Sequence, residues 1–202
     1  MHRPAQSPGR TPATSSKRNS DRTYDSLYLV RAAPAVAPRS LPVAAYVHEW
    51  LPLRLEVTPL ATPEDVQGEP VRCRPRYLHL FAHGAVDGVL LDDGEGGCGW
   101  KLPYPLLAEM VRATPGLRCV LLSACDSAYA ASATGSGEPY LIAMRGRVSV
   151  DAAIAFASGF YEALAAREDT PIEAAFAQGL IRLKLIAPLD AGVPLLATGW
   201  RG

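Results

Sequence analysis

Two near-continuous apolar runs constrain the fold of this chain more than any other feature. They are YLHLFA at residues 77–82 and LRCVLLSA at residues 117–124, and each ends in a short polar loop. Such runs are typical of central parallel strands that are covered on both faces, because neither face meets water. Weaker strand candidates lie at 27–30, 53–57 and 139–144. A small hairpin arm is predicted at 88–92, with its turn at 93–97.

Three segments have the apolar spacing of helices that pack on a sheet. One begins at Thr170, with Pro171 in the first turn and Glu173 completing a capping box, and its apolar stripe runs from Ile172 to Ile186. The other two cover residues 151–166 and 103–112, the latter with Leu106, Leu107, Met110 and Val111 facing inward. Strands that alternate with helices predict an α/β fold with a mostly parallel central sheet.

Composition excludes several classes of protein. The chain has 202 residues, of which 49% are hydrophobic, and its 20 Lys and Arg balance its 20 Asp and Glu, which argues against a nucleic-acid binder. No apolar run approaches the roughly 20 residues of a membrane span, and the first residues lack the apolar core of a secretory signal. We therefore expect a cytoplasmic protein that binds neither nucleic acid nor membrane.

The first 23 residues differ in composition from the rest of the chain. They are rich in proline, serine and basic residues and carry no aliphatic periodicity. This composition predicts a disordered basic tail over 1–23 and a folded domain over 24–202. A solvated leader explains the tail more simply than a specific phosphate or partner contact does.

Candidate site residues follow the two strongest strands. His83 and Gly84 come after the first strand, and Cys125, Asp126 and Ser127 come after the second. Neighbouring strands lie about 4.8 Å apart, so these loops would meet at the carboxyl edge of the sheet. An imidazole can take the proton of a thiol and later return it to a leaving amine. Gly84 lets the backbone approach closely, so that its N–H and that of Cys125 can face an oxyanion.

Each of these residues also has a structural interpretation. Cys125 can be a small buried hydrophobe, which is our interpretation of Cys119, and a histidine beside a glycine is commonly a turn residue. Taken singly, the structural interpretations are preferred. The position of His83 and Cys125 together, directly after the two most strand-like runs, favours a catalytic site.

Other motifs in the sequence fit known sites poorly. His79 and His83 form H-x-x-x-H, but on a strand they are about 13 Å apart, too far for one zinc ion, so we expect His79 to pack on a face of the strand. The glycines at 94–99 match G-x-G-x-x-G, yet no helix pattern starts after them. The sequence has neither a G-x-S-x-G elbow nor a P-loop. We expect no metal and no cofactor.

Taken in order, these segments resemble a known domain family. In order, they are YLHLFAHG, a hairpin with LLDDG, a helix, VLLSACDSA, and IAMRGRVSVDAAIAFASGFYEALA followed by TPIEAAFAQGL. They are similar to the segments of the CHAT domain. This bacterial family is related to caspases, metacaspases and separases. The resemblance covers residues 53–186 and implies a caspase-like three-layer αβα sandwich.

The resemblance also implies roles for individual residues. His83 would be the general base and acid, Cys125 the nucleophile, and the amides of Gly84 and Cys125 the oxyanion donors. His79 would be a structural or orienting residue. The implied activity is that of a cysteine endopeptidase that cleaves protein substrates, and the implied role is in bacterial defence or stress signalling.

Two acidic residues are candidates for substrate recognition. Asp126, beside the nucleophile, can pair with a basic P1 side chain, or it can be a loop carboxylate that faces solvent. Asp151 invites the same idea, but the N-cap of the helix it opens is the preferred interpretation.

The alternative function is a CHAT pseudoprotease that acts as a protein–protein interaction module. The segment 126–140 is shorter than is usual in the family and leaves no room for both a covering helix and a loop, which favours this alternative. Retention of both His83 and Cys125 favours the enzyme. Tetratricopeptide repeats, the sensors often fused to CHAT domains, are not recognisable in the sequence, so we expect a regulatory partner protein to supply that function.

Overall fold

The computed structural model describes residues 26–31, 54–59, 63–91, 100–132, 138–167 and 169–200. The tail predicted at 1–23 and the turn predicted at 93–97 lie outside the described residues. The division of the chain at residue 24 therefore stays a prediction.

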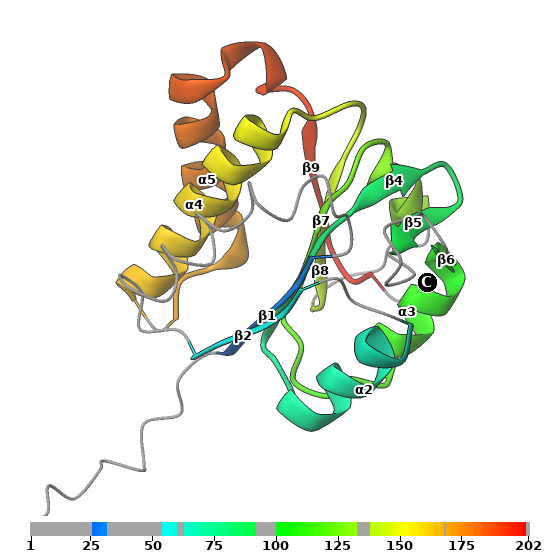
Figure 1. The fold of residues 1–202 in the computed structure, drawn as a ribbon. Coiled ribbons are helices and arrows are strands. Elements are labelled where there is room, and N and C mark those ends of the chain that lie inside the picture. Colours follow the sequence, from blue (N-terminus) through cyan, green and yellow to red (C-terminus); the bar gives the residue numbers. More distant parts are fainter. Residues whose placement is uncertain are drawn as a thin grey trace, which may run out of the picture.

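A six-stranded sheet with the order β2-β1-β3-β7-β8-β9 forms the centre of the molecule (Figure 1). All neighbours are parallel except β9, which runs antiparallel to β8. The strands are β1 (Ser26–Arg31), β2 (Arg54–Pro59), β3 (Tyr77–Phe81), β7 (Cys119–Ser123), β8 (Tyr140–Met144) and β9 (Pro194–Ala197). The first five confirm the predicted strands, whereas the short β9 was not predicted.

Helices cover both faces of this sheet, which makes the predicted three-layer αβα sandwich (Figure 1). On one face lie α2 (Pro63–Cys73) and α3 (Tyr104–Arg112), and on the other α4 (Val150–Ala166) and α5 (Ile172–Ile186). Every residue of β3 and β7 is buried, as expected of strands covered on both sides. Within the described ranges, every helix is too short or too polar to cross a membrane.

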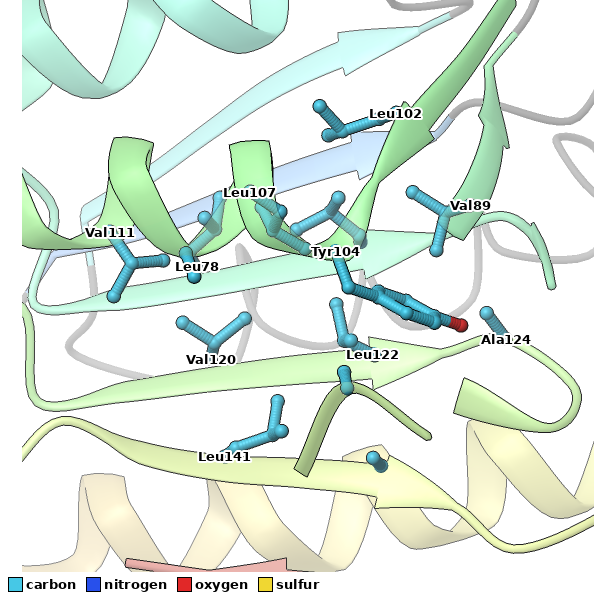
Figure 2. Close-up of a cluster of buried hydrophobic side chains, with 14 of the residues drawn as sticks. Leu78, Val89, Leu102, Tyr104, Leu107, Val111, Val120, Leu122, Ala124 and Leu141 are labelled. Atoms are coloured by element: carbon cyan, nitrogen blue, oxygen red, sulfur yellow. The ribbon is translucent and has the colours of Figure 1, made fainter. Parts of the chain in front are cut away.

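The side chains of the central strands alternate between two hydrophobic cores. Leu78, Val120 and Leu122 pack with Leu107 and Val111 of α3 in the first core (Figure 2). Residues of the same strands one position away pack against α4 and α5 in the second core, including Tyr77, Cys119 and Leu121. The period of two along each strand therefore divides the apolar runs between the two helical layers.

A second, three-stranded antiparallel sheet lies beside the end of the central one. It contains β4 (His83–Ala85), β5 (Gly88–Leu91) and β6 (Trp100–Pro103). The arm predicted at 88–92 is therefore confirmed as part of this sheet. His83, expected in a loop, is the first residue of β4 instead and pairs with Leu90.

The helices depart from the sequence predictions at their ends. The proline-rich segment before β3 contains α2, a helix of 11 residues that the sequence analysis did not predict. Pro63 is the first residue of α2, where a missing N–H costs nothing, and only Pro70 lies inside the helix.

The predicted helix caps are wrong. Ser149, and not Asp151, caps α4, because its side chain accepts a hydrogen bond from the Ala152 N–H at 3.2 Å. Thr170 caps nothing: its hydroxyl donates to carbonyls at the end of α4, and Glu173 accepts from the Tyr140 hydroxyl instead of closing a capping box. The Thr170 hydroxyl is used by the end of the preceding helix, and the Glu173 carboxylate is used by the distant Tyr140.

Two apolar residues expected in the core are exposed. Leu106 of α3 is 39% exposed and Ile186 of α5 is 63% exposed. Tyr104 is buried in the core instead, at the start of α3. Ile186 is the last residue of α5 and follows Leu183, the last buried residue of the helix.

Candidate active site

Adjacent strands bring the two candidate loops to one edge of the sheet. β3 and β7 are hydrogen-bonded neighbours, with Phe81 opposite Ser123. Just beyond this pair, the Ala82 N–H donates to the Ser123 carbonyl at 3.3 Å. The chain segments that begin at His83 and Cys125 therefore leave the sheet side by side.

Backbone contact between Gly84 and Cys125 joins these two segments. A Cβ atom on Gly84 would lie 1.7 Å from the carbonyl oxygen of Cys125 and 2.8 Å from its nitrogen. Real Cβ atoms do not approach other atoms this closely, so only glycine fits here. The sequence predicted a close approach at Gly84, and the structure places Cys125 itself in the space a side chain would fill.

The Cys125 loop contacts the residues that follow β8. The half-buried thiol lies 4.0 Å from the Val148 carbonyl oxygen. Asp126 has a positive φ of 57°, a conformation that aspartate tolerates, and its N–H donates to the Gly146 carbonyl at 3.1 Å. These contacts turn the chain sharply directly after the cysteine.

Ser127 supplies a further link that was not predicted. Its buried hydroxyl donates to the Leu122 carbonyl at 3.3 Å and accepts from the Met144 N–H at 2.9 Å. One hydroxyl thus connects the ends of β7 and β8. The only signal in the sequence was a small polar residue two positions after the cysteine.

After the cysteine the chain forms a 3-10 helix. This element, η1 (Ser127–Ser132), contacts β8 and β5. Segment 126–140 was expected to leave no room for both a covering helix and a loop, and η1 is the short helix that it does contain. Tyr129 of η1 is 59% exposed.

His83 lies on β4 with an exposed side chain. No described residue forms a hydrogen bond with its ring. The pairing of β4 with β5 and the Gly84 contact therefore position the backbone that carries this imidazole, and its side chain is exposed to solvent.

Asp126 is half-buried, which places it between the two interpretations that the sequence allowed. Its negative charge acts on the Tyr104 hydroxyl. Burial is the main cause that raises the pKa of Tyr104 to about 12, and the charges of Asp126 and then Asp87 contribute in the same direction. A role in substrate recognition stays a prediction.

His79 is a buried residue of the sheet, as expected. It is 0% exposed, and its Nε2 lies 2.8 Å from the Ser123 hydroxyl oxygen. Burial lowers the pKa of His79 to about 3, because a charged imidazole would lose its hydration there. Cys119 is also confirmed as a core residue, and burial raises the pKa of its thiol. No group of metal-ligating side chains occurs among the residues that the structure describes.

Tyr104 is the buried polar side chain that sequence reasoning missed at this edge. Its hydroxyl donates to the Ala85 carbonyl at 2.8 Å, on the strand that carries His83. In the sequence, a tyrosine at the start of a predicted helix cannot be distinguished from an apolar residue that packs in the core.

Solved structures with the same architecture define the class of fold. The chain superimposes on a structure described as a protease with a TM-score of 0.61 at 9% identity, covering 89% of this chain and 48% of that one. The Arg specific cysteine proteinase gingipain R gives a TM-score of 0.56 at 11% identity, covering 87% and 46%, respectively. A secreted C11 cysteine protease from Bacteroides thetaiotaomicron, solved with an irreversible peptide inhibitor, gives 0.52 at 14% identity, covering 77% and 57%. The fold is that of the caspase-like cysteine proteases.

Sequence comparison names the family within this class. The CHAT domain model matches residues 1–184, so the chain belongs to the CHAT domain family. The chain spans about half the length of the solved structures it matches. No curated protein matches its sequence.

Proposed function

We propose that this protein is a cysteine endopeptidase in which Cys125 is the nucleophile and His83 the general base and acid. The observation that supports this most directly is the backbone contact between Gly84 and Cys125. It brings an exposed histidine and a half-buried thiol, from separate strands, to one edge of a caspase-like sheet. That edge is where working residues of open parallel sheets gather.

The reaction follows from these two side chains. The His83 imidazole accepts the thiol proton of Cys125, and the thiolate attacks the carbonyl carbon of the scissile peptide bond. The negative oxygen of the tetrahedral intermediate accepts hydrogen bonds from the N–H groups of Gly84 and Cys125. As the C–N bond breaks, His83 returns its proton to the leaving amine, and a thioester remains. Water, deprotonated by His83, hydrolyses the thioester and regenerates the thiol.

Substrate preference and control belong to the same proposal. The Asp126 carboxylate next to the nucleophile offers a partner for an Arg or Lys side chain at P1. Gingipain R, which shares this fold, is described as Arg specific. Uncontrolled proteolysis harms its host, so we propose a regulatory partner protein and a role in bacterial defence or stress signalling.

Alkylation kinetics test the chemistry without a known substrate. Iodoacetamide modification of Cys125 is followed by mass spectrometry across pH, in the wild type and in His83→Ala. We expect Cys125 to react well below the usual thiol pKa of about 8.5, and this reactivity to disappear with His83. Cys73, a half-buried thiol on α2, is an internal reference whose profile should not depend on His83. If Cys125 titrates as an ordinary thiol in both proteins, the interaction-module alternative takes the place of the enzyme.

Cys125→Ala separates activity from folding. A slightly smaller side chain at a half-buried position should leave the midpoint of thermal unfolding nearly unchanged, while cleavage of Arg- and Lys-containing peptides stops. Asp126→Asn should reduce cleavage after basic residues and leave Cys125 alkylation unaltered. Extensive unfolding of Cys125→Ala would show that the cysteine is a packing residue.

A further inference from the structure

Tyr104 of α3 contacts the turn that follows the His83 strand at two points. The strands β4 and β5 are joined by Val86 and Asp87. The Tyr104 hydroxyl donates to the Ala85 carbonyl at 2.8 Å, and the Tyr104 N–H donates to the Asp87 carbonyl at 3.2 Å. One residue of α3 thus binds the backbone on both sides of Val86.

The Tyr104 ring also reaches the cysteine side of the site. It is buried in the same core as Leu122 and Ala124, the residues that lead to Cys125 (Figure 2). In Figure 2 its hydroxyl end points toward the end of β7, where Ala124 lies. The Asp126 charge acts on this hydroxyl, in agreement with that placement.

The hydroxyl is a hydrogen-bond donor at every pH where the enzyme would work. Burial is the main cause that raises the pKa of Tyr104 to about 12, so the O–H stays protonated. The other described side-chain contact of this turn, between Lys101 and Asp87, is an exposed ion pair at 2.5 Å. Exposed pairs of this kind contribute little.

We propose that Tyr104 is a positioning residue that holds the His83 strand against the Cys125 loop. It acts through the Ala85 carbonyl and touches neither substrate nor the reacting atoms. The inference rests on the proposed function. Without the hydroxyl, β4 keeps its pairing with β5 and the Tyr104 N–H keeps its bond to Asp87, but the Ala85 carbonyl loses its side-chain partner on α3. The strand that carries His83 is then positioned less precisely relative to the Cys125 loop.

Tyr104→Phe tests this inference, because it removes only the hydroxyl. We expect the rate of Cys125 alkylation below pH 7 to fall by roughly three- to tenfold, the size expected for one lost hydrogen bond. The pH profile should shift toward that of His83→Ala, and with a peptide substrate kcat should fall while KM stays the same. Amide hydrogen exchange in residues 83–89 should become faster.

Tyr140→Phe is the matched control. Tyr140 also loses a hydroxyl hydrogen bond, to Glu173, but at the opposite end of the sheet, at the start of β8. Its Cys125 profile should equal that of the wild type. The buried Cys119 thiol reports on the fold, since it becomes alkylated only when the core opens.

The outcomes separate the two proposals. A Tyr104→Phe profile equal to that of the wild type, with His83 dependence intact, overturns the positioning role and leaves the peptidase proposal standing. Loss of Cys125 reactivity together with alkylation of Cys119 shows general destabilisation and also overturns it. Wild-type Cys125 that behaves as a free thiol overturns the peptidase proposal and the positioning role with it.

Discussion

The two layers that flank the central sheet are held together in different ways. On one face, α4 and α5 pack along most of their lengths through small and aromatic side chains. A Cβ on Gly159 would lie 2.9 Å from Arg182 Cβ, and Phe156 and Phe176 meet edge to face at 5.5 Å. Many apolar contacts share the stabilisation there, so no single one decides the geometry.

The candidate site, at the carboxyl edge of the central sheet, is positioned through few contacts. The strand β4 meets the Cys125 loop through backbone at Gly84 and meets α3 through the Tyr104 hydroxyl. These contacts join segments that are distant in the sequence. The α4–α5 layer is thus held by many apolar contacts, whereas the candidate site is held by a few specific ones.

Substitution of one glycine in each of these two regions gives the largest expected contrast in Cys125 reactivity. Gly84→Ala places a methyl group on the Cys125 backbone, where no rotation relieves the overlap. We expect a loss of about 3 kcal/mol in the free energy of unfolding and loss of low-pH Cys125 reactivity. A Cβ on Gly159 would also overlap its neighbours, with Arg182 Cβ and the Gln178 carbonyl oxygen at 2.9 Å each, but this overlap is smaller and alanine favours the helix. We therefore expect Gly159→Ala to cost about 2 kcal/mol and to leave Cys125 reactivity unchanged.

Urea denaturation and Cys125 alkylation measure this contrast. If the two substitutions changed Cys125 reactivity equally, the site would be no more sensitive to the Gly84 contact than to a change between α4 and α5.

The second prediction concerns the buried polar group on the α4 side, His79. In the unfolded chain its imidazole takes a proton below about pH 6.5, while burial keeps it neutral in the folded protein down to about pH 3. The unfolded state therefore binds more protons in this window. The free energy of unfolding should fall as the pH decreases from 6.5 to 3, by about 1.4 kcal/mol per pH unit from this group.

A double variant isolates the contribution of His79. His79→Leu with Ser123→Ala removes both partners of the buried hydrogen bond, so neither is left unpaired. Urea denaturation at several pH values should show a smaller slope than in the wild type, with the part due to carboxylates remaining. An unchanged slope would mean that His79 is protonated in the folded protein.

The smallest predicted effect distinguishes the two cap candidates of α4. Ser149→Ala removes the hydroxyl that binds the Ala152 N–H and should cost about 1 kcal/mol. Asp151→Ala, on the exposed first turn, should cost less. Thermal unfolding of the two variants measures the difference, and neither should alter Cys125 reactivity. A larger loss of stability in Asp151→Ala than in Ser149→Ala would show that Asp151 is the cap of α4.

Much of the central fold is predictable from the sequence alone. The apolar runs identified β3 and β7, and their place in one parallel sheet brought His83 and Cys125 to the same edge. The helical stripes identified α3, α4 and α5. These predictions succeed because burial on one or two faces leaves a periodic pattern in the chain itself.

Only the tertiary structure decided which atoms meet at the candidate site. Gly84 fits against Cys125, Ser127 joins two strand ends, and Tyr104 anchors the β4–β5 turn. The same holds for Ser149, whose hydroxyl donates to the distant Asp190 carboxylate while it caps α4 where Asp151 was expected. Each of these depends on the register and closure of elements far apart in the sequence. Hydrophobic periodicity records which side of an element is buried, but it carries no information about the partner that a backbone carbonyl or a hydroxyl will find there.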